Sequence, residues 1–441
     1  METMQTKKWS MYNNWFPNGE ETLLYNSASD VAMALLPQIK ELTDRYKDNP
    51  ALLENVHPTL YSFMSEKGFI VDADADETRQ LIARWAAEEN NPETFSMTIN
   101  PTLNCNLRCW YCYEEHAAGM DMHPEVVDSI RKLIANKVKE PLLKRLNIGF
   151  FGGEPLMKFR DVVLPILTYA KEQCRLFQKK LGVRFTTNGV LLTSKVITEL
   201  AAFNEDFPVF LQITLDGNRE VHDQTRHGKG GGKTYDAIVG HIRHCLKAGM
   251  EVGLRFNYTA DNIDSFADVL REFEELPSCE KKRIRVDFQQ VWQDGGNREA
   301  PKKAEIQAEW YKQCGLKTSS GKAITPIHCY ADYENCVVIN YTGDLYKCTA
   351  RDFTPQLREG ALMPDGTLKW NERYKKRMAI KHGISLCHAC RLFPICHGGC
   401  SQSKMENDGK ETCLYHYSEK EKTDILKWRM EWILTHYDVS Y

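Results

Sequence analysis

Between residues 93 and 300, short apolar runs alternate with longer segments in which apolar side chains recur at helical spacing. In one such segment Val163, Ile166 and Ala170 share a face, and in another Ile238 and Ile242 do. This alternation predicts an α/β fold with a parallel sheet and right-handed crossovers, either doubly wound or curled into a partial barrel. The six predicted strands are residues 95–100, 146–151, 183–187, 209–215, 251–257 and 285–291.

The first 88 residues follow a different pattern. Two stretches rich in aromatic and β-branched residues flank a turn at residues 17–19, which predicts a hairpin. A helix carrying Val31, Leu35 and Ile39 on one face is expected next, then a second helix and a short strand at 69–71. Together these elements predict a small α+β domain of the winged-helix type.

The C-terminal part divides into two further regions. Residues 320–417 are rich in cysteine and poor in long periodic segments, which predicts a domain held by inorganic ligands rather than by a large core. Residues 418–441 predict a helix with Ile425, Trp428 and Trp432 on one face. The expected domains are therefore residues 1–88, 93–300, 320–417 and the terminal helix.

Composition narrows the class of protein. Apolar residues make up 42% and charged residues 27% of the 441, which is typical of folded globular chains. A net charge of -3 argues against a strongly basic nucleic-acid binder, and no apolar run is long enough to span a membrane. Fifteen cysteines with no signal-peptide pattern favour a reducing, cytoplasmic location and metal or cluster ligation over disulfides.

Three cysteines follow the first predicted strand of the barrel region: Cys105, Cys109 and Cys112. Their spacing allows three thiolates to face one centre, one fewer than a closed four-ligand site needs. An iron–sulfur cluster held in this way keeps one iron open to an outside ligand. A structural zinc site with His116 as the fourth ligand is the alternative.

The second predicted strand is followed by Gly152, Gly153 and Glu154. Two glycines let a ligand approach the backbone closely, and the carboxylate suits an ammonium group. Combined with the three-cysteine loop, this pattern resembles the radical S-adenosylmethionine (SAM) enzyme superfamily. Further matching segments end the later strands: Thr187-Asn188-Gly189, Thr214-Leu215-Asp216-Gly217 with His222, Asp223 and Arg226, and Arg255-Phe256-Asn257.

The resemblance implies a partial (β/α)6 barrel with a 4Fe–4S cluster on the three cysteines and SAM on the open iron. It places Gly152, Gly153 and Glu154 at the methionyl ammonium and Tyr111 near the adenine. It also implies polar contacts to the cofactor from residues at the ends of later strands. Those candidates are Asn188, Thr214, Asp216 and Asn257.

The C-terminal cysteines resemble the SPASM extension of radical SAM enzymes, which carries two auxiliary 4Fe–4S clusters. If Cys336 were not a ligand, the first auxiliary cluster would be open. A module holding two zinc ions is the other interpretation. The resemblance implies Cys329, Cys336, Cys348 and Cys400 as one ligand set and Cys387, Cys390, Cys396 and Cys413 as the other.

Two branches of such enzymes fit the chain differently. Anaerobic sulfatase maturases, which form formylglycine, typically have an aspartate directly after the cysteine that Cys348 matches; here that residue is Thr349. Maturases of ribosomally made peptides often carry an N-terminal peptide-recognition domain, which the first 88 residues resemble. The favoured function is therefore an oxidative crosslink, thioether or carbon–carbon, in a precursor peptide.

The expected partners follow from this function. The N-terminal domain would bind the leader of the precursor by strand addition. An electron donor such as flavodoxin or ferredoxin would reduce the clusters, and no nucleic acid or membrane is expected. Formylglycine formation in a protein and a zinc-stabilised binding protein without catalysis remain the alternatives.

Overall fold

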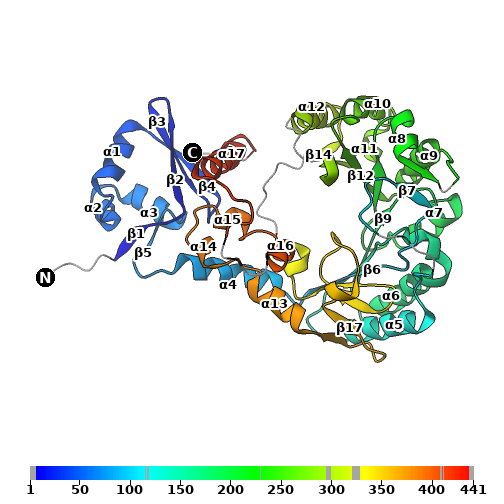
Figure 1. Cartoon of the computed structure of the whole chain (residues 1–441). Helices are drawn as coiled ribbons and strands as arrows, with labels where there is room; N and C mark the ends of the chain where they lie inside the picture. Colours follow the sequence, from blue (N-terminus) through cyan, green and yellow to red (C-terminus); the bar gives the residue numbers. More distant parts are fainter. Residues whose placement is uncertain are drawn as a thin grey trace. The chain divides into compact units, whose positions relative to one another are not determined.

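The computed structural model of the chain describes residues 6–436 except 115, 117–118, 229, 295–298, 320–327, 408–409 and 411. Contacts within the chain define two compact units (Figure 1). One contains the chain up to Asn90, residues 324–332 and the chain from Lys376 onward; the other contains residues 91–323 and 333–375. The first is called the terminal unit below and the second the barrel unit.

The barrel unit contains all six predicted strands, each within three residues of the expected limits. They pair in parallel in chain order, which confirms the partial-barrel prediction. A short seventh strand, which the apolar pattern did not reveal, extends one edge. The strands are β6 (Thr94–Ile99), β8 (Arg145–Phe150), β9 (Lys180–Thr187), β10 (Phe210–Leu215), β12 (Glu251–Tyr258), β13 (Ile284–Gln290) and β14 (Lys317–Ser319).

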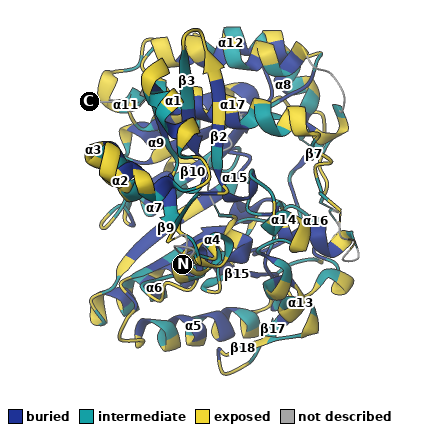
Figure 2. Cartoon of the chain, turned by 90° about the vertical axis from the view of Figure 1, so that its left-hand side faces the viewer, coloured by how far each residue is buried: buried dark blue, intermediate teal, exposed yellow. Residues whose placement is uncertain are grey.

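Helices connect these strands and bury one face against the sheet (Figure 2). In the first of them, Val127, Ile130 and Ile134 are buried at the spacing of one helical face. Helical segments of this unit are α5 (Pro124–Val138), η2 (Pro155–Lys158), η3 (Phe159–Val163), α6 (Leu164–Leu176), α7 (Ser194–Ala201), α8 (Arg219–Thr225), α9 (Tyr235–Lys247), η4 (Ile263–Ser265), α10 (Phe266–Leu270), α11 (Ser278–Lys281), η5 (Trp292–Asp294) and α12 (Glu299–Gln313).

Part of the cysteine-rich region continues the barrel sheet on its other edge. Cys336 begins a strand that pairs in parallel with β6, and three antiparallel strands follow it to give an 11-stranded sheet. These strands have only three or four residues, too few for a sequence pattern to stand out. They are β15 (Cys336–Ile339), β16 (Asp344–Tyr346), β17 (Gly360–Leu362) and β18 (Leu368–Trp370); β7 (Leu107–Cys109) pairs separately with β11 (Arg226–Gly228).

The terminal unit contains the predicted hairpin, which is confirmed with Gly19 at φ +62° in its turn. The helix expected around Val31 and Leu35 is wrong, because residues 31–35 pair with the hairpin as a third strand. The helix begins only at Pro37, whose fixed φ suits the first helical position. The elements are β1 (Lys7–Trp9), β2 (Asn13–Asn18), β3 (Glu21–Asn26), β4 (Val31–Leu35), α1 (Pro37–Arg45), η1 (Pro50–Leu52), α2 (Leu53–Val56), α3 (Pro58–Glu66), β5 (Ile70–Asp72) and α4 (Glu77–Glu89).

The last helix, α17 (Glu419–His436), belongs to the core of the terminal unit. Its buried apolar side chains are Leu426, Met430 and Ile433, which share a cluster with Phe16 and Tyr25 of the hairpin. Two residues of the predicted face, Ile425 and Trp432, pack against this cluster but are only partly buried, and the more deeply buried side chains lie one position further along the helix. No helix in the described ranges combines the length and apolar character that a membrane crossing requires. The shorter C-terminal elements are η6 (Tyr330–Asp332), η7 (Pro355–Leu357), α13 (Glu372–Ile380), α14 (Ser385–His388), α15 (Phe393–Cys396) and α16 (Ser401–Glu406).

Candidate functional site

The three cysteines after β6 lie together in the barrel unit. Burial raises the pKa of Cys105 to about 11, and the neighbouring thiol of Cys109 adds to the increase. Burial also raises the pKa of Cys112, again with Cys109 as a neighbour. The set therefore offers three close thiols, protonated without metal, that would release protons on binding iron. This donor set fits an iron–sulfur cluster with one open iron.

The Gly-Gly segment after β8 supports the cysteine loop directly. A Cβ atom at Gly152 would lie 2.4 Å from the carbonyl oxygen of Thr102, and one at Gly153 would lie 2.2 Å from that of Asn104. The amides of Gly153 and Glu154 donate to the same two carbonyls at 3.1 and 2.8 Å. Glycine is required here because the cysteine loop packs onto the strand end, a reason that the sequence alone does not reveal.

The Glu154 carboxylate is fully buried and anchored to the end of β9. It accepts hydrogen bonds from the Thr187 hydroxyl at 2.8 Å, from the Asn188 amide at 2.7 Å and from the Leu156 amide at 3.0 Å. Burial raises its pKa, and these donors oppose the rise. Carboxylate oxygens have further acceptor capacity, so these bonds hold the group in place and leave it able to accept from an ammonium.

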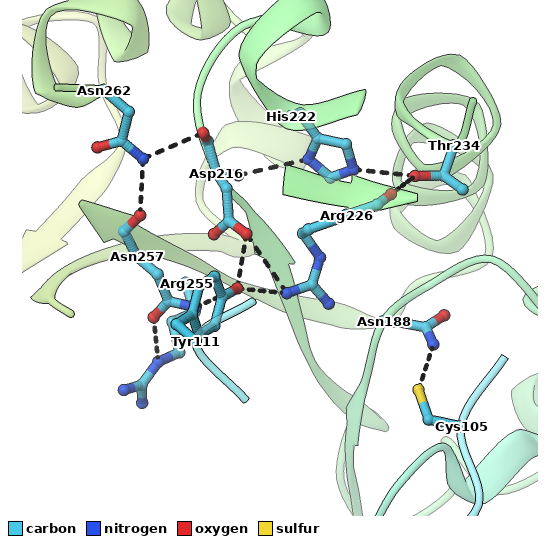
Figure 3. Close-up of polar contacts among 10 residues, drawn as sticks. All are labelled: Cys105, Tyr111, Asn188, Asp216, His222, Arg226, Thr234, Arg255, Asn257 and Asn262. Atoms are coloured by element: carbon cyan, nitrogen blue, oxygen red, sulfur yellow. Dashed lines mark hydrogen bonds and ion pairs between the residues drawn. The ribbon is translucent and has the colours of Figure 1, made fainter. Parts of the chain in front are cut away.

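Asn188 links β9 to the cysteine loop. Its side-chain amide donates to Asn106 Oδ1 at 2.8 Å. The same amide contacts Cys105 Sγ at 3.7 Å (Figure 3). Hydrogen bonds to ligand sulfurs are one of the means by which a protein tunes an iron–sulfur cluster. The structure thus places Asn188 beside a predicted cluster ligand.

A buried network joins Tyr111 to the ends of β10 and β12 (Figure 3). The Tyr111 hydroxyl donates to Asp216 Oδ2 at 2.6 Å and accepts from Arg226 at 2.6 Å and from Asn257 Nδ2 at 3.0 Å. Arg226 also pairs with Asp216 at 3.5 Å, and both side chains are almost inaccessible to solvent. Burial raises the pKa of Asp216, whereas the positive charge of Arg226 opposes this rise. Arg226 thus favours the ionised form of Asp216, as a buried ion pair requires.

This network shows which predicted contacts the structure brings together. Tyr111, Asp216 and Asn257 are joined by hydrogen bonds, and Thr214 is buried on β10, which ends directly before Asp216. Sequence analysis placed Arg226 behind a matching segment but did not include it among the candidate cofactor contacts, although it is the cation of the group. Arg226 is the first residue of β11 and is paired with Cys109 on β7 of the cysteine loop, a position that only the fold reveals.

His222 supports the same strand end through a chain of polar contacts (Figure 3). Its Nδ1 accepts from the Asp216 amide at 3.4 Å, and its Nε2 lies 3.1 Å from the hydroxyl of Thr234, which donates to the Arg226 carbonyl. Burial, with Arg226 nearby, lowers the pKa of His222 to about 3. The ring is therefore neutral, and the contacts assign its proton to Nε2.

Acidification is expected to destabilise the barrel unit through His222. The unfolded chain binds a proton below pH 6.5 and the folded chain does not until about pH 3, so stability falls across this interval. From pH 7 to pH 5 the loss attributable to His222 is about 2 kcal/mol. Urea unfolding of the full-length chain at both pH values measures it, and His222→Asn should reduce the pH dependence by that amount. An unchanged dependence in the variant would contradict the assignment.

His116, the candidate fourth ligand of a zinc site, lies next to one of the three cysteines. Its Nε2 is 3.3 Å from Cys112 Sγ, and its Nδ1 is 2.7 Å from the Leu103 carbonyl. Over the described ranges, no group of three or more His, Cys, Asp or Glu side chains surrounds a single point as one metal ion requires. In a cubane each thiolate binds a different iron, so cluster ligands need not converge in that way.

One predicted auxiliary set lies entirely within the terminal unit. Burial raises the pKa of Cys396 to about 12, and the neighbouring thiols of Cys390, Cys387 and Cys413 add to the increase. His397, directly after Cys396, adopts a left-handed conformation at φ 51°, which turns the chain sharply beside the thiols. Four gathered thiols are the donor set of a closed cluster, so these residues fit the predicted group.

The other predicted set is distributed over both units, with Cys329 and Cys400 in the terminal unit and Cys336 and Cys348 in the barrel unit. It stays a prediction. Within the barrel unit, the segment that holds Cys348 reaches the first cluster loop, because the Tyr113 hydroxyl donates to the Thr349 carbonyl at 2.7 Å. Cys336 is partly buried on β15, where burial raises its pKa and Lys347 lowers it.

Comparison with known proteins agrees with this geometry. Residues 99–273 match the Radical SAM superfamily. Mycofactocin maturase MftC of Mycolicibacterium smegmatis is 27% identical over 334 residues, which cover 70% of this chain and 78% of that protein. Native anSMEcpe with bound AdoMet and Kp18Cys peptide has a TM-score of 0.59 at 18% identity, over 78% of this chain and 100% of that one. Streptococcus suis SuiB bound to precursor peptide SuiA has a TM-score of 0.50 at 16% identity, over 93% and 100%.

The partial barrel and its three-cysteine loop agree with this family match, and residues 99–273 form a radical SAM domain. Within that family, the chain is related in sequence to the mycofactocin maturases over most of its length. The two solved structures share its fold.

Proposed function

We propose that the chain matures a ribosomally synthesised precursor peptide by forming an oxidative crosslink, a thioether or a carbon–carbon bond. The observation that carries this proposal is the extent of the similarity to MftC. It covers 334 residues, whereas the radical SAM match covers only residues 99–273. The likeness therefore includes regions outside the radical chemistry. The fold shared with SuiB, which was solved with a precursor peptide, supports the same substrate class.

The residues of the barrel unit have distinct parts in this reaction. Cys105, Cys109 and Cys112 would hold the first 4Fe–4S cluster, and Glu154 would accept a hydrogen bond from the methionyl ammonium. When bound, the cluster and SAM supply a hydrogen-atom acceptor through one-electron cleavage of a C–S bond. The ion pair of Asp216 and Arg226 keeps the strand ends rigid, so that the cofactor pocket is preorganised.

Crosslinking removes two hydrogens from the peptide. One leaves as a hydrogen atom to the cofactor, and the other leaves as a proton while one electron must depart as the new bond forms. We infer that an auxiliary cluster accepts this electron and that a flavodoxin or ferredoxin exchanges electrons with the enzyme. The contact between Tyr113 and Thr349, which places the Cys348 segment beside the first cluster loop, supports this route. With both auxiliary sets filled, the chain would hold three 4Fe–4S clusters.

The terminal unit offers a site for the leader of the precursor. Its three-stranded sheet has β2 and β4 as outer strands in the described part of the chain, and an extended leader could pair with either. The hairpin shares its core with Leu392, Ile395 and the last helix. Deleting the first 88 residues would expose that core, so recognition is better tested by shortening the peptide than by truncating the enzyme.

Anaerobic incubation of the reconstituted enzyme with a peptide encoded beside its gene tests the function. We expect the peptide to lose the mass of two hydrogens per crosslink when SAM and a reductant are present. A peptide without its leader should bind the full-length enzyme more weakly. Replacement of a sulfur by an oxygen together with loss of two hydrogens would instead indicate formylglycine made from cysteine. Loss of two hydrogens that leaves an aldehyde reactive toward a hydrazine would indicate formylglycine made from serine, and either product would contradict the crosslinking proposal.

A further inference from the structure

A cavity opens in the barrel unit, at the edge of the sheet opposite the cysteine loop. It has a volume of about 380 Å³. Its walls come from the amino-terminal ends of consecutive strands: Arg145 begins β8, Phe210 begins β10, Glu251 begins β12 and Lys317 begins β14. The candidate active-site residues all lie at or beyond the carboxyl ends of the strands. This cavity is therefore separate from the site of radical chemistry.

The cavity is strongly positive. Six cationic side chains line it, with Glu251 as the single carboxylate. Salt bridges are common on this chain. Among the described residues, however, none of these six cationic side chains forms a salt bridge. Burial lowers the pKa of Arg145, and the neighbouring charge of Arg184 lowers it further. The six are Arg145, Arg184, Lys282, Arg283, Arg285 and Lys317.

Two of the arginines are held in fixed positions. The Arg145 guanidinium lies 3.8 Å from the centre of the Phe207 ring, and its Nε donates to Asn147 Oδ1 at 2.7 Å. Gly182 leaves room for this arrangement, because a Cβ there would lie 2.5 Å from Asn147 Oδ1. Arg184 lies over Phe210 at 5.7 Å. Stacking on a ring face orders the guanidinium and leaves its N–H edge available to an anion.

A purely structural role does not explain this composition. The amino-terminal edge of a barrel ordinarily serves stability, and a stabilising edge would pair its cations with carboxylates. Six like charges around one cavity repel each other and weaken the fold, unless an anion neutralises them. A concave site with ordered guanidinium groups also suits a small ligand better than the flat face of an acidic protein.

We propose that this cavity binds a small oligophosphate-bearing anion at the amino-terminal edge of the barrel. Guanidinium groups bind phosphate oxygens in a forked, two-point geometry, and lysines at the rim add charge without fixed direction. The proposal concerns ligand binding alone and does not depend on the peptide substrate or on any cluster.

Titration calorimetry of inorganic pyrophosphate into the full-length protein, at constant ionic strength, tests the site. We expect saturable binding of one pyrophosphate per chain. The double variant Arg184→Gln/Arg285→Gln should weaken it at least tenfold. Arg271→Gln, which changes an exposed arginine outside the cavity, should bind like the wild type.

Each contrary result has a defined meaning. Heats that do not saturate, or equal affinity in the double variant, would overturn the site, provided that the variant unfolds at the wild-type urea concentration. Equal affinity for citrate would overturn the assignment to phosphate, since the cavity would then respond to charge alone. Binding that survives in the double variant but competes with SAM would locate the anion in the cofactor pocket and contradict the proposal.

Discussion

Replacing Cys105 with alanine is expected to abolish formation of 5′-deoxyadenosine from SAM. Three thiolates hold a 4Fe–4S cluster that has one open iron. Losing one thiolate is expected to remove the cluster and, with it, the iron that binds SAM. Cys105 is the most buried of the three, at 7% exposure, and its sulfur accepts from the Leu107 amide at 3.4 Å. Chromatography of an anaerobic reaction with SAM and dithionite measures the loss.

Iron analysis makes this test specific. The wild type should contain about twelve irons per chain after reconstitution, and Cys105→Ala about eight, since each 4Fe–4S cluster holds four. Cys279→Ala is the matched control, because this cysteine is exposed and belongs to no predicted ligand set. If Cys105→Ala still formed 5′-deoxyadenosine, the assignment of the first cluster would be wrong. Stoichiometric zinc in the wild type would favour the binding-protein alternative.

The barrel could be predicted because its signals are local. Strands such as β10 and β12 alternate apolar residues with polar or small ones, and this period of two indicates a strand directly in the sequence. The cysteine loop and the Gly-Gly segment follow strands directly, so the parallel topology alone brings them to one edge. What joins them, the packing of Gly152 and Gly153 on loop carbonyls, depends on a close approach between two loops and has no sequence signature.

Other features depend on contacts between distant segments. The sequence around Val31 fits a helix or a strand, and pairing with β3 decides between them. β15 joins the sheet beside β6 although more than 230 residues separate the two strands. Arg226 likewise gains its role only when β11 pairs with the cysteine loop. Tertiary pairing of this kind overrides local propensity, which is why the apolar pattern missed each of these features.

A buried carboxylate in the terminal unit shows the same dependence on distant segments. Glu89, at the end of α4, is 1% exposed and accepts from His328 Nδ1 at 2.9 Å, His382 Nε2 at 2.8 Å and Lys381 Nζ at 2.7 Å. Burial alone would raise its pKa, but these three donors hold the pKa below its usual range. The His328 ring stacks on His397 at 4.1 Å. Since Cys329 follows His328 and Cys396 precedes His397, the carboxylate anchors segments from both predicted auxiliary sets.

Replacing Glu89 with alanine is expected to cost about 3–5 kcal/mol of stability, because Lys381 would remain buried without its counter-ion. The depressed pKa means that this contribution is complete above pH 4.5, the usual value for the group, and is lost as acid protonates the carboxylate. Urea unfolding at pH 7 measures the effect, and Glu88→Ala, an exposed neighbour on the same helix, should change stability by less than about 0.5 kcal/mol. If the two variants unfolded at the same urea concentration, Glu89 would not anchor these segments.

Iron content shows which clusters the Glu89→Ala variant loses. The variant should lose iron from the auxiliary sets and should still cleave SAM, because the first cluster belongs to the other unit.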